Sequence, residues 1–144
     1  MSKPASGHFN STNAATINDW SSYTTNVWSS IKATQENYPH TQLPRSFVMS
    51  TDSGQLWVHP HATGHMYDDI TTNKNNQNRL KISNPNLYTQ FILHDFKTTI
   101  NIALKQNLKY NKSYDIGNWQ FTISPPRQKE QYPVVKHAVF KGWK

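Results

Sequence analysis

The sequence predicts an α+β domain in which N-terminal helices pack on one face of a four-stranded antiparallel sheet. Three patterns lead to this prediction. A long apolar stripe with helical spacing covers residues 85–106, a strict apolar–polar alternation begins at Trp119, and Asp52-Ser53-Gly54 separates two short apolar runs like the turn of a β-hairpin. With 144 residues, the chain has the length of one domain.

The N-terminal part is predicted from its composition and spacing. Residues 1–12 are polar and are expected to be a flexible linker remnant, which leaves 13–144 as a single domain. Apolar side chains recur at helical intervals over 13–37. Many Ser, Thr and Asn residues give this segment a poor intrinsic helix propensity, so we expect a helix that depends on packing.

The central part is predicted to contain a hairpin and two helices. Strands are expected at 47–50 and 55–59, and a short helix follows at 61–70. Asn84-Pro85 has the form of an N-cap followed by proline at the first helical position. We therefore expect the long helix to begin there.

Two final strands complete the predicted sheet. Trp119, Phe121 and Ile123 alternate with polar residues, which is typical of a strand with one buried face. The two prolines at 125–126 end that strand, and an apolar run at 134–140 predicts the last one.

Basic side chains are concentrated in the second half of the chain. The chain carries 15 Lys and Arg against 8 Asp and Glu, for a net charge of +7. Twelve of the basic residues, but only three of the acidic ones, lie within residues 71–144. This asymmetry predicts a surface for a polyanion, with nucleic acid preferred as the partner over an acidic protein.

Several function classes are excluded by what the sequence lacks. Cysteine is absent, which excludes disulfides, cysteine nucleophiles and zinc sites built on thiolates. No apolar run approaches the length of a membrane span, and the first residues lack the apolar core of a signal peptide. The sequence contains neither a phosphate-binding P-loop nor a dinucleotide-binding glycine motif.

The densest group of chemically active side chains is the run WVHPHATGH at residues 57–65. In one interpretation, His59 and His65 act as general acid and base, because imidazole has a pKa of roughly 6.5 and titrates near working pH. RNA would supply the nucleophile as its 2′-hydroxyl, so this chemistry needs no metal and no cofactor. In the alternative interpretation, His59, His61 and His65 bind a divalent metal ion. We prefer the first.

A second group of candidates lies near the C-terminal end. His137 is expected to be the acid or base partner of the hairpin histidine, His59, provided that the first and last strands are neighbours. Arg127 is expected to clamp phosphate and Thr122 to donate a hydrogen bond to it. Lys136 alternates with His137, so the two side chains share a face only if the strand bulges.

The remaining candidates would bind RNA without taking part in proton transfer. Trp57 is expected to stack on a base. The other expected RNA-binding side chains are Arg79, Lys81, Lys109, Lys112, Ser124 and Lys136. A non-catalytic nucleic-acid-binding module would use the same side chains and remains the alternative from another functional class.

Two stretches resemble a known group of proteins. Residues 43–66, which include LPRSF and WVHPHATGHM, look like the start of C-terminal toxin domains of bacterial polymorphic and contact-dependent inhibition toxins, and WQF at 119–121 with YPVVKHA at 132–138 resembles their close. The order of helices and strands is similar to the barnase/EndoU/colicin/RelE group of ribonuclease folds. By motif, the resemblance implies a catalytic role for only three residues, His59, His65 and His137.

The resemblance implies a biological setting. It implies metal-independent cleavage of RNA, commonly transfer RNA, and a cognate immunity protein, which we expect to be acidic. Such a domain would be delivered as the C-terminal part of a larger secreted or cell-surface toxin and would act in the cytoplasm of the target cell. It would be a monomer apart from the immunity complex.

Overall fold

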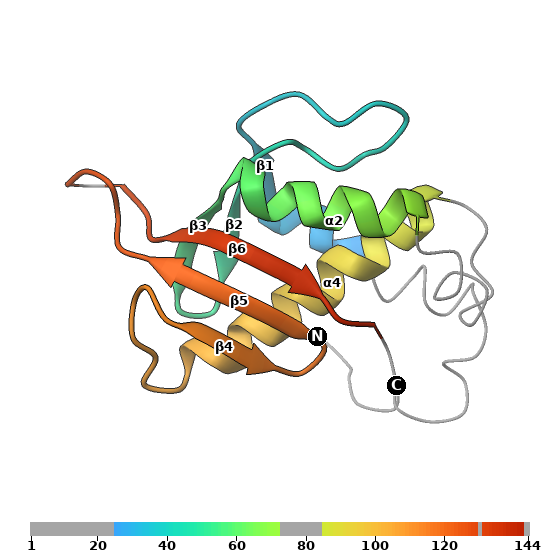
Figure 1. Ribbon diagram of the computed structural model, residues 1–144. Helices are drawn as coiled ribbons and strands as arrows, with labels where there is room; N and C mark the ends of the chain where they lie inside the picture. The colour runs from blue at the N-terminus through green and yellow to red at the C-terminus, as the bar shows by residue number, and fades with distance from the viewer. Residues whose placement is uncertain (1–24, 73–84, 130, 143–144) are drawn as a thin grey trace.

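A computed structural model describes residues 25–72, 85–129 and 131–142 (Figure 1). Its centre is a six-stranded mixed sheet with the strand order β1-β2-β3-β6-β5-β4. The strands are β1 (Ile31–Ala33), β2 (Phe47–Thr51), β3 (Gly54–Val58), β4 (Ser113–Ile116), β5 (Trp119–Ser124) and β6 (Val134–Phe140). The other elements are a 3-10 helix, η3 (Thr25–Ser30), and two α-helices, α2 (Pro60–Thr72) and α4 (Pro85–Leu104).

The predicted four-stranded antiparallel sheet is wrong in two respects. The sheet has two additional strands, β1 and β4, and its central pair, β3 and β6, is parallel. Parallel strands need a long crossover connection, and here α2, α4, β4 and β5 all lie between the two strands in sequence. The α+β class holds, but the predicted antiparallel arrangement does not.

The predicted N-terminal helices are also wrong within the described residues. Residues 13–24 lie outside the described residues, and 25–37 form η3, the short strand β1 and the start of a loop instead of an α-helix. Ile31 of β1 pairs with Met49 of β2, so tertiary pairing prevails over the weak helical spacing of this segment.

The elements with strong sequence patterns are where they were predicted. The β2–β3 hairpin, the long helix α4 and the strands β5 and β6 all form, and α4 begins at Pro85. Helix α2 begins at Pro60 and extends to Thr72, so it is slightly longer than predicted.

The core lies between α4 and one face of the sheet. The side chains of Trp119, Phe121 and Ile123 on β5 are buried on that face, and the Phe96 ring of α4 lies 4.9 Å from the Trp119 ring, measured between centroids. The Trp119 indole N–H donates to the Asp95 carboxylate of α4 at 2.8 Å. The opposite face of β5 carries the half-exposed polar residues Gln120, Thr122 and Ser124. We call this second face, which α4 does not cover, the polar face.

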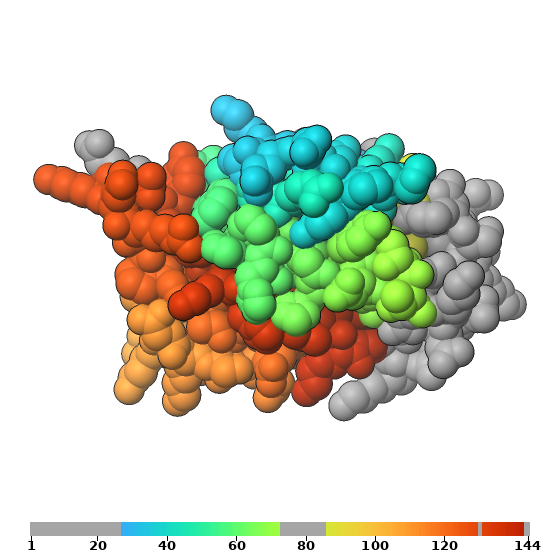
Figure 2. All heavy atoms as spheres, turned by 45° about the horizontal axis from the view of Figure 1, so that its top comes forward, coloured from blue at the N-terminus to red at the C-terminus, as the bar shows by residue number. Residues whose placement is uncertain are grey.

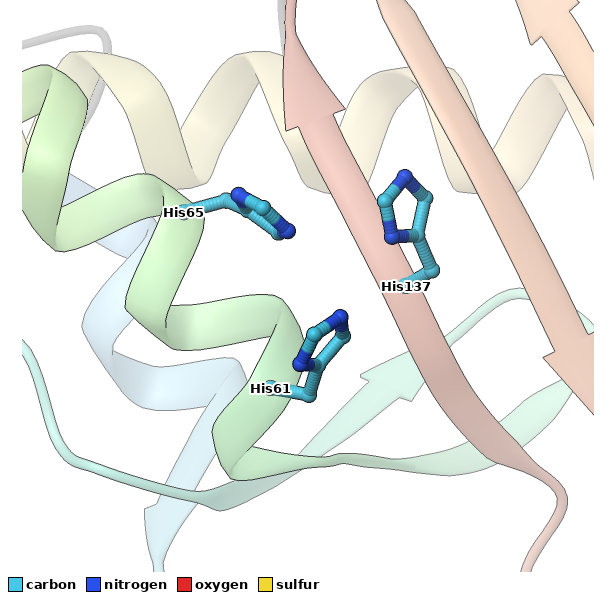
Figure 3. A group of neighbouring side chains, drawn as sticks. All are labelled: His61, His65 and His137. Carbon is cyan, nitrogen blue, oxygen red and sulfur yellow. The ribbon is translucent and has the colours of Figure 1, made fainter.

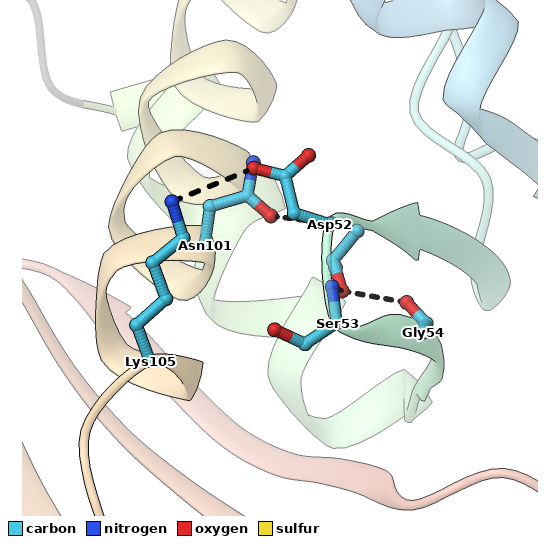
Figure 4. A network of polar contacts seen from close by, with 6 residues as sticks. Asp52, Ser53, Gly54, Asn101 and Lys105 are labelled. Carbon is cyan, nitrogen blue, oxygen red and sulfur yellow. Dashed lines mark hydrogen bonds and ion pairs between the residues drawn. The ribbon is translucent and has the colours of Figure 1, made fainter.

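The turn of the β2–β3 hairpin is attached to α4 (Figure 4). The Asp52 backbone N–H donates to the Asn101 side-chain oxygen at 2.9 Å, and the Asp52 carboxylate lies 3.8 Å from the Lys105 ammonium. The Thr51 hydroxyl closes the turn by donating to the Gly54 carbonyl. These contacts hold the hairpin against the helix and so help to fix the start of α2, which follows β3.

Helix α2 takes over from β3 as the neighbour of β6. Strand β3 pairs with β6 only through Trp57–Val134 and Val58–Val135, and α2 then runs beside the rest of β6 (Figure 1). Figure 2 shows α2 at the molecular surface, between the segment that follows β1 and strand β6. Among the described helices, none is long and apolar enough to cross a bilayer.

Candidate active site

His59 forms the N-cap of α2. Its ring Nδ1 accepts a hydrogen bond from the His61 backbone N–H at 2.9 Å, and its carbonyl accepts from the N–H groups of Ala62 and Thr63. Pro60 follows at the first helical position, where its missing N–H costs nothing. The His59 N–H donates to the Val135 carbonyl at 3.0 Å, so this N-cap residue also continues the backbone hydrogen bonding between β3 and β6.

The far side of α2 is fixed by a buried threonine. The Thr63 hydroxyl donates to the Arg45 carbonyl at 2.6 Å and lies 3.0 Å from the Tyr38 hydroxyl. The Tyr38 ring stacks on Tyr67, one turn further along the helix, with 4.4 Å between ring centroids. These contacts set the rotation of α2 about its axis, and His61 and His65 lie on the side that faces β6 (Figure 3).

A β-bulge sets the direction of His137. Thr122 of β5 pairs with His137 of β6, but the next residue, Ile123, pairs with Val135, so Lys136 is the extra residue. The bulge allows His137 to lie on the polar face beside Thr122, while Val135 and Ala138 stay buried in the core. The strand therefore does bulge at Lys136, which is the condition under which neighbouring residues such as Lys136 and His137 can share a face.

Three imidazoles converge between α2 and β6 (Figure 3). The ring centroids of His65 and His137 are 5.0 Å apart, those of His61 and His65 are 5.1 Å apart, and those of His61 and His137 are 5.8 Å apart. One nitrogen from each ring can be chosen so that all three lie within 4.8 Å of one another. We call His61, His65 and His137 the three-histidine group. His61 is exposed and the other two are half-buried, so solvent reaches the group.

Burial and the neighbouring imidazoles disfavour a proton on His137. Burial lowers the pKa of His137 below its usual value, and the neighbouring His65 and His61 lower it further. A proton on one ring therefore makes a proton on His137 less favourable. His137 is therefore held in its neutral form more strongly than a free histidine is.

His59 lies outside this group. Burial lowers its pKa, and the nearby charges of Arg127, His61 and Lys136 lower it further. Its Nδ1 must keep a lone pair to accept from the His61 N–H, which places the proton of the neutral ring on Nε2. The structure thus gives His59 the role of a helix cap beside two cations.

A pocket of about 480 Å³ opens next to the cap. It lies where the β5–β6 connection meets the end of β3, and its lining residues are Trp57, Arg127, Gln128, Gln131, Tyr132 and Val134. The Arg127 guanidinium lies 5.5 Å from the Trp57 ring centroid, and the Trp57 indole N–H donates to the Thr34 hydroxyl. Trp57 is therefore held in place as one wall of the pocket.

The other predicted RNA-binding residues are spread over the molecule. The exposed Lys109 and Lys112 lie on the α4–β4 connection, where the Lys112 ammonium is 5.6 Å from the Tyr114 ring centroid. The Ser124 hydroxyl is 2.8 Å from the side-chain oxygen of Asn111 on the same connection. Arg79 and Lys81 lie outside the described residues.

The partnership of His61 with His137 was missed by sequence reasoning. His61 was considered only as a metal ligand together with His59 and His65, whereas the structure groups it with His65 and His137. The predicted helix start at residue 61, one residue later than the observed start, concealed this grouping. Proline at 60 marks the first helical position, which makes His59 the cap and places His61 and His65 four residues apart on one helix face.

Comparison with models of known protein families gives no match, and comparison with curated proteins gives none either. A functional assignment for this chain therefore depends on the geometry of the three-histidine group and its surroundings.

Proposed function

We propose that this domain is a metal-independent ribonuclease that uses histidines for proton transfer. The observation that carries the proposal is the convergence of His61, His65 and His137 at a solvent-accessible position, with Thr122 of β5 paired to His137. General acid–base cleavage of RNA requires two proton-transfer groups within one small site, and imidazoles can serve as both.

In the proposed reaction, neutral His137 removes the proton from the ribose 2′-hydroxyl. The 2′-oxygen attacks the adjacent phosphorus, and the bond from phosphorus to the 5′-oxygen breaks. Protonated His65, whose ring centroid is 5.0 Å from that of His137, gives its proton to the departing 5′-oxygen. The products are a 2′,3′-cyclic phosphate and a 5′-hydroxyl.

The electrostatics of His137 favour its role as the base, because burial and the neighbouring imidazoles lower its pKa and so keep it neutral at pH 7. His61, exposed at the start of the helix, would bind the phosphate oxygens, and Thr122, which pairs with His137, would donate a hydrogen bond to them.

The surroundings supply binding groups for RNA. Arg127 and Lys136 are both exposed and close enough to His59 to lower its pKa, so positive charge lies between the pocket and the three-histidine group. The aromatic walls of Trp57 and Tyr132, with the amides of Gln128 and Gln131, suit a nucleobase next to the cleaved phosphate. Lys109 and Lys112 would contact phosphates further along the chain.

We propose that the protein acts as a toxin and that its substrate is transfer RNA. The likeness of residues 43–66 and 132–138 to bacterial toxin domains supports this role, as does the net charge of +7. An acidic immunity protein that covers the three-histidine group would neutralise the activity.

The test is cleavage of purified transfer RNA in the presence of EDTA, with detection of 2′,3′-cyclic phosphate ends. We expect His65→Ala and His137→Ala to lower the rate by roughly 10²–10⁴-fold while the far-UV circular dichroism stays native. His40→Asn is the matched control. It removes an exposed imidazole from a loop position with φ of 62°, a conformation that asparagine tolerates.

The outcomes separate the candidate functions. Full activity in both site variants would refute the histidine mechanism. RNA binding by the native protein without cleavage would instead support the non-catalytic binding module. Induced expression in bacteria tests the toxin role, because the native domain should arrest growth and the two site variants should not.

A further inference from the structure

We infer that the three-histidine group is also a reversible site for a divalent transition-metal ion of the zinc class, and that the bound ion blocks the chemistry. The binding half of this inference stands on the geometry of His61, His65 and His137 alone. The inhibitory half rests on the proposed function.

The donor set selects the class of ion. Three imidazole nitrogens converge, the chain has no cysteine, and neither Asp nor Glu belongs to this cluster in the described part of the chain. Imidazole suits zinc, copper and nickel, whereas magnesium and calcium prefer oxygen ligands. Three histidines with an open fourth position form a known zinc arrangement.

The geometry requires only side-chain movement. Zinc–nitrogen bonds of about 2.1 Å in a tetrahedral site place the nitrogens about 3.4 Å apart. The candidate nitrogens now lie within 4.8 Å of one another, so pairs of them must approach by up to about 1.4 Å. His61 is exposed and His65 and His137 are half-buried, which leaves their rings room to rotate. Their backbones are already held by the cap of α2 and the pairing of β6.

The surroundings predict moderate affinity. In dedicated zinc sites, the second ring nitrogen of each histidine usually donates to a carboxylate or carbonyl, which orients the ring. Within residues 25–72, 85–129 and 131–142, the three rings make no such hydrogen bond to the protein. We therefore expect an ion that binds and leaves, in contrast to a permanent structural zinc.

Metal binding and proton transfer exclude each other at this site. A nitrogen that coordinates zinc has no lone pair left to accept the 2′-hydroxyl proton, so it cannot act as the base. A nitrogen that has lost its proton in order to bind zinc has no proton to donate, so it cannot act as the acid. An ion held by His65 and His137 thus removes the base and the acid together. We expect zinc to lower the rate of RNA cleavage at least tenfold, EDTA to restore it, and magnesium to have no such effect.

The experiment is calorimetric titration of untagged protein with Zn²⁺ in the absence of RNA, supported by the visible spectrum with Co²⁺. We expect one ion per chain for the native protein and for His59→Asn, because asparagine keeps the helix cap and His59 is not a ligand. His65→Ala and His137→Ala should bind at least tenfold more weakly. Circular dichroism of each variant confirms that it is folded.

The results distinguish this inference from the proposed function. Zinc binding that is absent from the native chain, or unchanged in both alanine variants, overturns the inference even if RNA is cleaved in EDTA. Zinc binding without any RNA cleavage supports the site and overturns the ribonuclease. Cleavage that is lost in EDTA and restored by zinc overturns both the inhibition and the metal-independent mechanism.

Discussion

Acid should destabilise this protein through His94, a half-buried residue on α4. Burial and the nearby Lys97 lower the pKa of His94 from 6.5 to about 4. The folded protein therefore holds this proton less tightly than the unfolded chain, and acid favours unfolding. The stability that comes from neutral His94 is complete above about pH 6.5 and is lost as the pH falls toward about 4.

The size of the effect follows from the shift. Each pKa unit corresponds to about 1.4 kcal/mol, so lowering the pH from 7 to 5 should cost at most about 2 kcal/mol at this residue. Asp95, the next residue, has a pKa raised by burial, which acts in the opposite sense near pH 4. Measurements at pH 5 and above therefore show the His94 effect most clearly.

The assay is urea unfolding followed by tryptophan fluorescence at pH 7 and pH 5, for the native protein and for His94→Gln. Glutamine does not titrate, so the variant should lose less stability on acidification, by up to about 2 kcal/mol. His40→Asn should behave as the native protein does. If His94→Gln and the native protein lose the same free energy of unfolding between these two pH values, the reasoning about His94 is refuted.

Three further changes test the packing and the pocket. Gly117→Ala should lower the free energy of unfolding by about 1–2 kcal/mol in urea titrations, because Gly117 has φ of 59° and an added Cβ would lie 3.3 Å from the Thr99 hydroxyl oxygen; an unchanged midpoint would contradict this. Trp119→Phe should cost about 1–3 kcal/mol, because Asp95 loses its 2.8 Å donor, and less in an Asp95→Leu background; equal costs in the two backgrounds would refute the role of this bond. Arg127→Gln should weaken RNA binding at low salt and reduce the salt slope by about one, whereas an unchanged slope would exclude a phosphate contact.

The long and regular elements were predictable because their patterns repeat. The apolar stripe of α4 and the alternation from Trp119 to Ser124 each extend over several turns or residue pairs, so chance agreement is small. The sequence pattern does not predict β4 (Ser113–Ile116). It has four residues, and only its antiparallel pairing with β5 from Ser113–Thr122 to Ile116–Trp119 shows that it belongs to the sheet. A short edge strand has too few residues for its apolar–polar alternation to be recognised from the sequence alone.

The candidate site was predictable as a set of residue types more than as an arrangement. The density of histidines at 59–65 and the isolated His137 drew attention to side chains of which the structure brings three together, His61, His65 and His137. Their arrangement depends on the parallel pairing of β3 with β6 and on the bulge at Lys136, and both are tertiary features. The different positions of His59 and His61 could have been predicted from Pro60. Proline favours the first helical position, so the residue before it is the N-cap, at His59-Pro60 as at Asn84-Pro85.

The pairing of β3 with β6 joins residues that are separated by more than half of the chain. A nascent chain on the ribosome can form the hairpin and begin α2 early, but it cannot bring an imidazole to His61 and His65 from a strand that has not been made. Until β6 emerges and docks, the polypeptide carries two histidines on a helix and nothing opposite them. The order of synthesis therefore delays the complete three-histidine group until β6 has emerged, and a premature stop before β6 would release a fragment without it.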